Sequence, residues 1–332
     1  MKENTRRVSL RSLPTIPILF LALVCSFLYL RNSLDSVLAP DSVLEQSFSF
    51  EPDGGDCQAF NGPRRPPWAR PLKMRDTIPQ FAKLYAKRPF KDNKGGMKFD
   101  HSFALWYTLR SLSPPPTTVI ESGAFHGHSA WLIKQTLPDA RIISLDPAAP
   151  KKILPRVEYM TAKDFVDFAK VDWKAKGVDA RKTLVFLDDH QSSFRRIFRE
   201  GHHQGFLRYI IEDNDPYPKG DNLGMKWVCE RERKDAWPGA VLDDFARKTT
   251  PQTWEEHIKQ GEEAERKTQF YYEFPPIAHE NFTKQTRYDS KYASHAIVQT
   301  ESDFNKLVPK LPLGEFGIYN HFSYVELKED AR

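Results

Sequence analysis

Two groups of acidic residues each follow a short apolar run of the chain. Asp188 and Asp189 come directly after Leu-Val-Phe-Leu, and Glu212 and Asp213 come directly after Tyr-Ile-Ile. If both runs form neighbouring parallel strands, their carboxyl ends meet at one edge of a sheet, where such sheets bind ligands. Carboxylates that converge repel one another, and a divalent cation between them relieves the repulsion. The pattern predicts that Asp188, Glu212 and Asp213 bind a hard cation such as Mg²⁺.

Histidines near these acids add further candidates. His190 follows the first acidic group and is a candidate nitrogen ligand or general base. Helix capping is an alternative explanation for some of the acids, because Asp and Asn commonly cap a helix that follows a strand. The density of polar residues in the two segments exceeds what capping requires. His126 and His128 lie in an earlier turn and are expected to be solvated rather than catalytic.

A glycine-containing turn precedes both acidic groups. An apolar run ends in Glu121, glycines follow at Gly123 and Gly127, a helix is expected over residues 129–137, and a second apolar run ends in Asp146. This order is typical of a nucleotide-type cofactor site. The glycines allow a close approach to a ligand, and an acid at Asp146 is placed to accept hydrogen bonds from ribose hydroxyls. The alternative is a tight turn in which the glycines serve only its geometry.

The elements that position these residues alternate between apolar runs and helical stretches. This alternation predicts an α/β fold with a doubly wound, mostly parallel, seven-stranded sheet covered by helices on both faces. A closing antiparallel pair is expected over His295–Thr300 and Gly317–Leu327. The other strands are expected at Thr118–Glu121, Arg141–Asp146, Val157–Met160, Thr183–Asp188 and Arg208–Glu212.

Length and composition are those of a globular protein. The 332 residues are 40% hydrophobic and include 23 Phe, 12 Tyr and 7 Trp, which is enough for a substantial core. Of the net charge of +5, residues 1–31 contribute +4. The rest of the chain is therefore nearly neutral, which argues against a nucleic-acid partner.

The amino terminus predicts membrane attachment. Residues 13–31 are almost uncharged and mostly apolar, close to the length of a spanning helix, and basic residues crowd residues 1–12. This predicts a cytoplasmic tail over 1–12, a signal anchor over 13–31, a Pro-rich stem over 32–76 and a catalytic domain over 77–332. Such a single-pass type II protein would carry its domain in the lumen of the Golgi or ER. A cleaved signal peptide is the alternative.

Two further features concern an oxidising compartment. Cys57 and Cys229 are either one disulfide or two unpaired thiols, and both readings stay open. Asn281 begins a glycosylation sequon, Asn-Phe-Thr. The sequence has no Cys-x-x-Cys spacing, so a structural zinc site with thiolate ligands is not expected.

Taken together, these motifs resemble class I S-adenosylmethionine-dependent methyltransferases. Within that superfamily, an Asp-rich strand end followed by a helix and Ile-x-Glu-Asp resembles the cephalosporin hydroxylase and rhamnosyl O-methyltransferase group. The sequence Asp189-His190-Gln191 differs from the motif that is usual in that group. The similarity covers residues 117–215. It is carried by Glu121-Ser122-Gly123-x-x-x-Gly127-x-Ser129, Asp146, Leu187-Asp188-Asp189-His190 and Ile211-Glu212-Asp213.

The resemblance implies roles for these residues and a Rossmann-like methyltransferase fold. Glu121, Gly123, Gly127, Ser129 and Asp146 would bind S-adenosylmethionine, with the glycines beside its methionine part. The three acidic ligands would bind Mg²⁺. Asp189 or His190 would remove the proton of an acceptor hydroxyl.

The layout of an amino-terminal anchor, a Pro-rich stem and a catalytic domain resembles that of Golgi glycan-modifying enzymes. It predicts methylation of a sugar hydroxyl on a glycan in the secretory pathway. Residues 216–290, which are rich in aromatics, are the expected source of acceptor contacts. Two alternatives stay open. One is a metal-dependent hydrolase or nucleotide-sugar enzyme on the same sheet, and the other is a catalytically silent luminal binding protein.

Overall fold

The computed structural model describes residues 57, 59–62, 64–91, 93, 95–215, 220, 223–242, 249–278, 296–308, 311, 315–316 and 322–329. All of them lie in one compact unit, Pro52–Arg332. The sequon at Asn281 and the predicted tail, anchor and first part of the stem lie outside the described residues.

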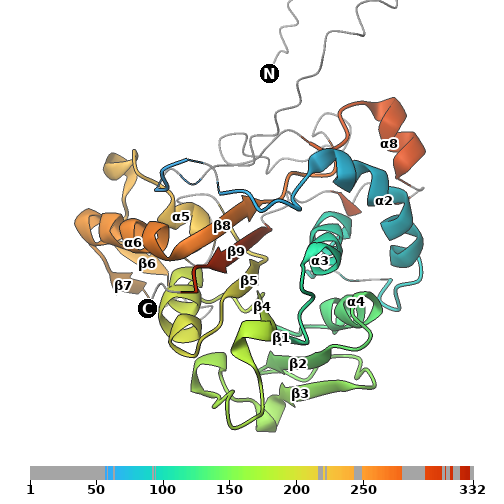
Figure 1. Cartoon of the computed structure of the whole chain (residues 1–332), viewed down its shortest axis with the longest axis horizontal. Helices are drawn as coiled ribbons and strands as arrows, with labels where there is room; N and C mark the ends of the chain where they lie inside the picture. Colours follow the sequence, from blue (N-terminus) through green and yellow to red (C-terminus); the bar gives the residue numbers. More distant parts are fainter. Residues whose placement is uncertain are drawn as a thin grey trace, which may run out of the picture. The chain divides into compact units, whose positions relative to one another are not determined.

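A seven-stranded sheet forms the centre of this unit (Figure 1), with the strand order β3-β2-β1-β4-β5-β9-β8. The chain runs outward from β1 through β2 to β3, then returns to place β4 on the other side of β1. The order therefore reverses between β1 and β4, and ligands of open α/β sheets bind at such a point. The strands are β1 (Thr118–Ser122), β2 (Arg141–Asp146), β3 (Val157–Thr161), β4 (Thr183–Leu187), β5 (Arg208–Ile211), β8 (Thr268–Glu273) and β9 (Ser323–Leu327).

The sheet is mixed rather than mostly parallel as predicted. Four neighbouring pairs are parallel, whereas β9 pairs antiparallel with both β5 and β8. The first five strands lie within one residue of their predicted bounds at each end. The predicted closing pair is wrong, because β9 pairs with β8 at Thr268–Glu273. Among the described residues of the predicted strand at 295–300, the backbone forms only an isolated bridge from Val298 to Ala278.

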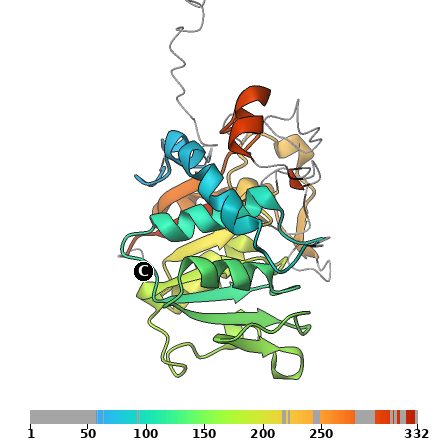
Figure 2. The same ribbon diagram turned by 90° about the vertical axis from the view of Figure 1, so that its right-hand side faces the viewer.

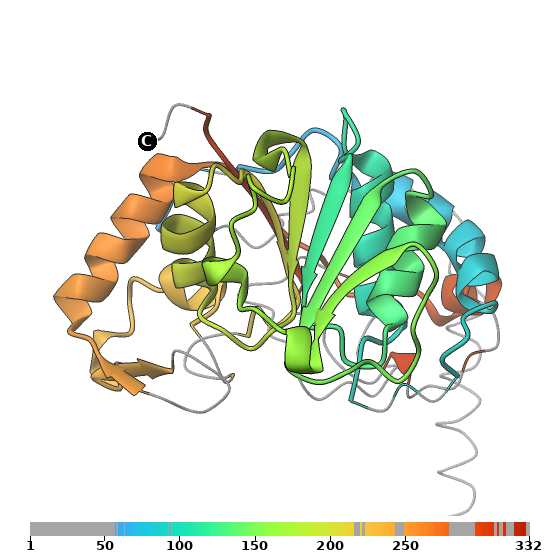
Figure 3. The same cartoon turned by 90° about the horizontal axis from the view of Figure 1, so that it is seen from below.

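Helices cover both faces of the sheet. Figures 2 and 3 show α2, α3 and α4 against one face, and Figure 3 shows α6 on the opposite side of the strands. Strand residues alternate between the two cores: Val119 packs with the first group of helices, and Ile120 faces the other core. The helices are α2 (Pro71–Tyr85), α3 (Phe99–Ser111), α4 (His128–Thr136), η2 (Ala162–Asp164), η3 (Phe168–Lys170), η4 (Ala180–Lys182), η5 (Arg195–Gly201), α5 (Met225–Val228), η6 (Lys234–Ala236), α6 (Trp254–Lys267) and α8 (Glu301–Leu307).

A small two-stranded sheet and the helix after it lie beside the main sheet. The strands β6 (Ala240–Leu242) and β7 (Thr249–Pro251) pair antiparallel. Helix α6 then begins with a capping box, in which the Thr253 side chain accepts from the Glu256 amide and Glu256 accepts from the Thr253 amide. This reciprocal cap satisfies two amides that a helix start would otherwise leave unpaired. It places the start of α6 directly after β7.

The sequence predicts that the folded domain starts at Thr77, but the folded unit begins earlier in the chain. Trp68, in the expected stem, packs edge-on against Tyr324 of β9 at 5.1 Å between ring centroids. Helix α2 begins at Pro71, a residue suited to a first helical position because its missing N–H needs no partner there. Part of the expected stem therefore belongs to the core.

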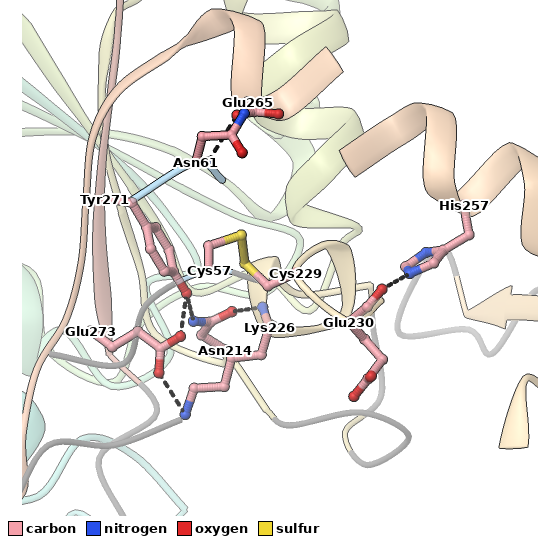
Figure 4. The surroundings of a disulfide bond; sticks show 10 residues. All are labelled: Cys57, Asn61, Asn214, Lys226, Cys229, Glu230, His257, Glu265, Tyr271 and Glu273. Atoms are coloured by element: carbon pink, nitrogen blue, oxygen red, sulfur yellow. Dashed lines mark hydrogen bonds and ion pairs between the residues drawn. A yellow bond between two sulfur atoms is a disulfide. The ribbon is translucent and has the colours of Figure 1, made fainter. Parts of the chain in front are cut away.

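Cys57 and Cys229 form a disulfide (Figure 4), which settles the alternative that the sequence leaves open. Both residues are buried. The bond joins positions 172 residues apart, so it ties the start of the described chain to the end of α5. Close beside it, Lys226 forms a fully buried ion pair with Glu273, 3.2 Å between Nζ and Oε2.

Replacing both cysteines with serine is expected to lower the free energy of unfolding by about 2–5 kcal/mol, because a long closed loop restricts the unfolded chain. Urea unfolding of the wild type and of the double variant C57S/C229S measures the difference. Reduction of the wild type should reproduce it. Equal midpoints for the three samples would contradict the structural role of this bond.

The predicted membrane topology is corrected by the structure. Within the described part of the chain, no helix combines the length and the apolar character needed to cross a membrane. Residues 13–31, on which the anchor was predicted, lie outside the described residues. The single-pass anchor, with a luminal domain in the Golgi or ER, is therefore withdrawn.

Candidate active site

The glycine turn after β1 sits against the end of β4. Gly123 has a φ of +104°, and its amide donates to the Leu145 carbonyl at 2.8 Å. A Cβ on Gly123 would lie 1.9 Å from the Asp188 carbonyl oxygen. Only glycine combines this backbone conformation with so close an approach. The predicted cofactor turn and the first acidic group are therefore in direct contact.

The second glycine of the turn starts helix α4. Gly127 has a φ of +89° and is the N-cap residue, and no side chain caps the helix there. A Cβ at this position would lie 3.0 Å from the Lys152 carbonyl oxygen in the loop after β2. The turn thus stays close to the neighbouring loop. The Ala130 amide, in the first turn of α4, is hydrogen-bonded to the Glu121 carboxylate.

Asp146, at the end of β2, holds the turn in place. Its Oδ2 accepts from the amides of Ala124 and Phe125 at 2.9 Å and 2.8 Å, and its Oδ1 accepts from the Ala148 amide at 2.7 Å. Both carboxylate oxygens are thus used by the protein. The expected contact with ribose stays a prediction, and the structure adds a positioning role that the sequence did not indicate.

Glu121 and Ser129 lie beneath the turn rather than on its surface. Glu121 has no exposed surface, and the Ser144 hydroxyl donates to its Oε2. Burial raises the pKa of Glu121 to about 7, although hydrogen bonds with Ser129 and Ser144 oppose the shift. Ser129, in the first turn of α4, is also buried. These two predicted cofactor residues support the turn from below.

The structure brings the three predicted metal ligands together. Carboxylate oxygens of Asp188, Glu212 and Asp213 all lie within 4.8 Å of one another. Desolvation and the neighbouring carboxylates, Glu212 first, raise the pKa of Asp188 well above its ordinary value. Charge repulsion of this kind is what a cation among the three oxygens would relieve. The donor set is all oxygen, which suits a hard cation.

His101 is a member of this cluster that sequence reasoning missed. It comes from α3, and its Nδ1 lies in hydrogen-bonding contact with Glu212 Oε1. Burial disfavours the charge on Glu212, but the His101 charge and hydrogen bond lower its pKa to about 2. Asp100 and His101 form a polar pair in a helix whose residues 99–109 are all buried. That pair in an apolar helix was the signal available in the sequence.

Asp189 and His190, the two predicted bases, differ sharply in environment. Asp189 Oδ2 accepts from the Ser122 hydroxyl at 2.6 Å and lies 3.0 Å from Arg196, a buried cation that the sequence did not single out. The His190 side chain is 40% exposed, and its Nδ1 lies 3.0 Å from Asp213 Oδ2. His190 also has a φ of +53°, a costly conformation for a residue with a side chain. Asp189 is thus tied into the protein, and His190 lies at the edge of the cluster.

The two histidines of the turn lie in different environments. His126 stacks on the half-exposed Phe125 at 3.7 Å between ring centroids. His128 is buried, against the expectation of solvation, with Nε2 3.0 Å from the Ser102 hydroxyl. Burial, followed by the charge of Arg88, lowers the pKa of His128 to about 3. It is therefore a neutral packing residue of α4.

His128 should make the stability of the protein depend on pH. Its pKa is about 3 in the folded state against 6.5 for the free side chain, so the unfolded state binds the proton more tightly. Its contribution is complete above pH 6.5 and is lost as the pH falls, by about 1.4 kcal/mol per unit. Between pH 6.5 and 4, the unfolding free energy of His128→Gln should fall less steeply with pH than that of the wild type. The difference in slope should correspond to one bound proton. Identical slopes for the two proteins would refute this role.

The expected aromatic acceptor surface is mostly core. Trp227, Tyr271 and Tyr272 are buried, and Phe270 packs against the core of the α2–α4 face. Trp237 packs edge-on against Trp227 and Trp254, at 6.3 Å and 5.6 Å between ring centroids, and lies against the second core. Tyr217 lies outside the described residues. The described aromatic side chains of this region therefore serve mainly the core, and acceptor contacts from residues 216–290 stay a prediction.

No protein-family model matches the chain, and no curated protein sequence matches it. Among solved structures, it is similar to the SAH-bound Podospora anserina methyltransferase PaMTH1, with 16% identity and a TM-score of 0.29. That match covers 42% of this chain and 62% of the other, less than two thirds of its length.

Two further solved structures are similar over more of the chain. The Burkholderia thailandensis 1,6-didemethyltoxoflavin-N1-methyltransferase, with S-adenosylhomocysteine bound, has 11% identity and a TM-score of 0.33, covering 80% of this chain and 93% of the other. The plantazolicin methyltransferase BpumL with SAH has 12% identity and a TM-score of 0.33, covering 78% and 95%. At these identities and TM-scores, the similarities carry no argument about what this chain binds or does. The finer resemblance to the cephalosporin hydroxylase and rhamnosyl O-methyltransferase group stays a prediction.

Proposed function

We propose that the chain is an S-adenosylmethionine-dependent O-methyltransferase. The observation that carries the proposal is the contact between Gly123 and the Asp188 carbonyl, which leaves no room for a side chain. A cofactor held by the turn would lie beside the cluster of Asp188, Glu212 and Asp213. This arrangement suits a reaction in which the turn holds a methyl donor and the acids serve a hydroxyl acceptor.

The donor side of the site is formed by the turn and its supports. Gly123 and Gly127 would lie beside the methionine part of the donor, where side chains would block its approach. Among the described residues, Asp146 Oδ1 accepts a single backbone hydrogen bond, and a carboxylate oxygen accepts two. A ribose hydroxyl is a suitable second donor to that oxygen. Glu121 and Ser129 would maintain the shape of the turn from beneath.

Asp188, Glu212 and Asp213 would hold Mg²⁺. The raised pKa of Asp188, caused by desolvation and by Glu212, is the observation that fits a cation there. When bound, Mg²⁺ would orient the acceptor hydroxyl and lower its pKa. His101 would keep Glu212 ionised and oriented as a ligand, as outer partners of metal ligands commonly do.

His190 is the better candidate for the general base. Asp189 is engaged by Ser122 and Arg196, whereas His190 is partly exposed beside Asp213. In the proposed step His190 takes the proton of the acceptor hydroxyl. The acceptor oxygen then bonds to the methyl carbon as the carbon–sulfur bond breaks, which yields a methyl ether and S-adenosylhomocysteine. In-line geometry is required for this displacement.

The proposed acceptor is a sugar hydroxyl of a glycan. A disulfide between Cys57 and Cys229 supports maturation under the oxidising conditions of the secretory pathway, where glycans are abundant. An acidic cluster that held Mg²⁺ would suit an acceptor that gains from a lowered hydroxyl pKa, as an alcohol does.

The test is methyl transfer by the full chain. The protein is incubated with S-adenosylmethionine bearing a labelled methyl group, Mg²⁺ and a panel of glycans, and the products are identified by mass spectrometry. Labelled methyl ethers are expected, and chelation by EDTA should suppress them until Mg²⁺ is restored. Turnover of nucleotide sugars or hydrolysis of the glycans, without methyl transfer, would favour the other enzyme class.

A further inference from the structure

A cavity lies next to the two acidic loops, on the side of the sheet that carries α6. Its volume is about 460 Å³, within the range of small-molecule sites. Ser192 lines it and belongs to the loop that begins at Asp188, and Leu223 lines it and follows the loop of Glu212 and Asp213. The Ser193 amide donates to the Leu223 carbonyl at 2.9 Å, so the two loops meet at the cavity wall.

The opposite wall comes from α6 and from the small sheet before it. In both Figure 1 and Figure 3, α6 and the β6–β7 pair lie on the same side of the main sheet. Thr250 and Gln252 line the cavity at the end of this pair, and Gln260 lines it from α6. The cavity is therefore built by segments that are distant in sequence from the acidic loops.

Gln252 is the residue that marks this cavity as a binding site. The residue lines the cavity but is only 6% exposed. Among the described residues, neither Oε1 nor Nε2 of its amide has a hydrogen-bond partner. A buried amide without partners is costly, and native proteins rarely leave one unexplained. The backbone of Gln252 is held by two hydrogen bonds. Its backbone N–H donates to the Gly239 carbonyl, and its backbone carbonyl accepts from the Trp237 indole N–H.

Gln260 repeats the pattern on the neighbouring element. Its Oε1 is buried and likewise has no hydrogen-bond partner among the described residues. Two residues with carboxamide side chains thus line the cavity, and each carboxamide has both donors and acceptors. The charged side chains on the lining are balanced in part by each other, as in the pair of Arg199 with Glu263. A neutral ligand with many groups that both donate and accept fits this lining best.

We infer that the cavity binds a saccharide unit of the methyl acceptor, with the amides of Gln252 and Gln260 bonded to its hydroxyls. A sugar hydroxyl donates one hydrogen bond and accepts others, which is the complement of a carboxamide. The sugar would be held beside the loop that begins at Asp188, which contributes Ser192 to the lining. Naming it a methyl acceptor rests on the proposed function, whereas the sugar binding itself does not.

The test measures saccharide binding without any methyl donor. Saturation-transfer NMR on the full chain uses a set of neutral oligosaccharides containing galactose, mannose, fucose or N-acetylglucosamine. The variants are Gln252→Leu and Gln260→Leu, and the control is Gln135→Leu on the exposed surface of α4. At least one saccharide should bind the wild type. Its affinity should fall at least 10-fold in each cavity variant and stay unchanged in the control.

Thermal melting of the same variants separates binding from structure. If the amides lack partners inside the protein, Gln252→Leu and Gln260→Leu should melt at the wild-type temperature or above it. A large fall in melting temperature, or failure to fold, would overturn the inference, because it would show that the amides are bonded within the protein. So would the absence of binding by every saccharide, or binding that both cavity variants retain.

The same measurements distinguish this inference from the proposed function. Saccharide binding that depends on Gln252, without methyl transfer to the bound sugar, would support the inference and count against the methyltransferase. Methyl transfer to a glycan whose KM is the same in the wild type and in both cavity variants would support the methyltransferase and count against the saccharide site.

Discussion

Replacing Gly123 with alanine is expected to reduce the affinity for S-adenosylmethionine at least about 100-fold, equivalent to about 2.7 kcal/mol. Two causes act together. The backbone at Gly123 has a φ of +104°, which side chains rarely tolerate. The new Cβ would also lie 1.9 Å from the Asp188 carbonyl oxygen and 2.5 Å from its carbon. These are backbone atoms at the end of β4, so they cannot rotate away as a side chain would.

The turn must therefore move in this variant. Displacement would pull the amides of Ala124 and Phe125 away from Asp146, which now accepts from both. The donor site would lose its shape, and the Asp188 loop would shift with it. Calorimetric titration with S-adenosylmethionine measures the affinity, and thermal melting reports whether the variant is folded.

Gly177→Ala is the matched control for this change. Gly177 also has a positive φ, +70°, but a Cβ there would meet no atom within 4 Å. It carries the strain without the collision at the site. Wild-type affinity is expected for Gly177→Ala, with some loss of stability. Tight donor binding by Gly123→Ala would contradict the assigned role of the turn.

Replacing Asp188 with alanine is expected to lower kcat at least about 1,000-fold while donor binding persists. Loss of one of three carboxylates would weaken the hold on Mg²⁺, whose stabilisation of the developing charge is worth several kcal/mol. The donor contacts of the turn do not use the Asp188 side chain. An enzyme would thus lose turnover, whereas a silent binding protein would show no change in ligand retention.

The stability of the same variant provides an independent check. Asp188 is desolvated among like charges, which raises its pKa, so its ionised form opposes folding near neutral pH. Asp188→Ala should therefore unfold at a urea concentration equal to or above that of the wild type. Asp139→Asn, at an exposed position, serves as the control and should leave both kcat and stability unchanged. A strongly destabilised Asp188→Ala would mean that the carboxylate serves the fold.

The parts of the fold that the sequence predicts well are those with local signals. The five parallel strands combine apolar runs with turn residues at their ends, and their bounds follow from that pattern. The same local logic brings Asp188, Glu212 and Asp213 together, because neighbouring parallel strands end at one edge.

The parts that the sequence does not predict depend on long-range packing. Strand β8 is followed by its partner β9 only after a connection of about fifty residues, so no hairpin signal exists between Thr268–Glu273 and Ser323–Leu327. His101 reaches Glu212 from a helix 111 residues earlier in the chain. Such contacts arise from the three-dimensional arrangement of elements, which residue spacing does not encode.

The central claim is that the turn after β1 holds S-adenosylmethionine beside the acidic cluster. Isothermal titration calorimetry of the full chain with S-adenosylmethionine and S-adenosylhomocysteine, in the presence of Mg²⁺, tests it most directly. The account predicts saturable binding of both compounds at one site, with no comparable binding of nucleotide sugars. A folded protein that binds neither compound, or that prefers a nucleotide sugar, would contradict it.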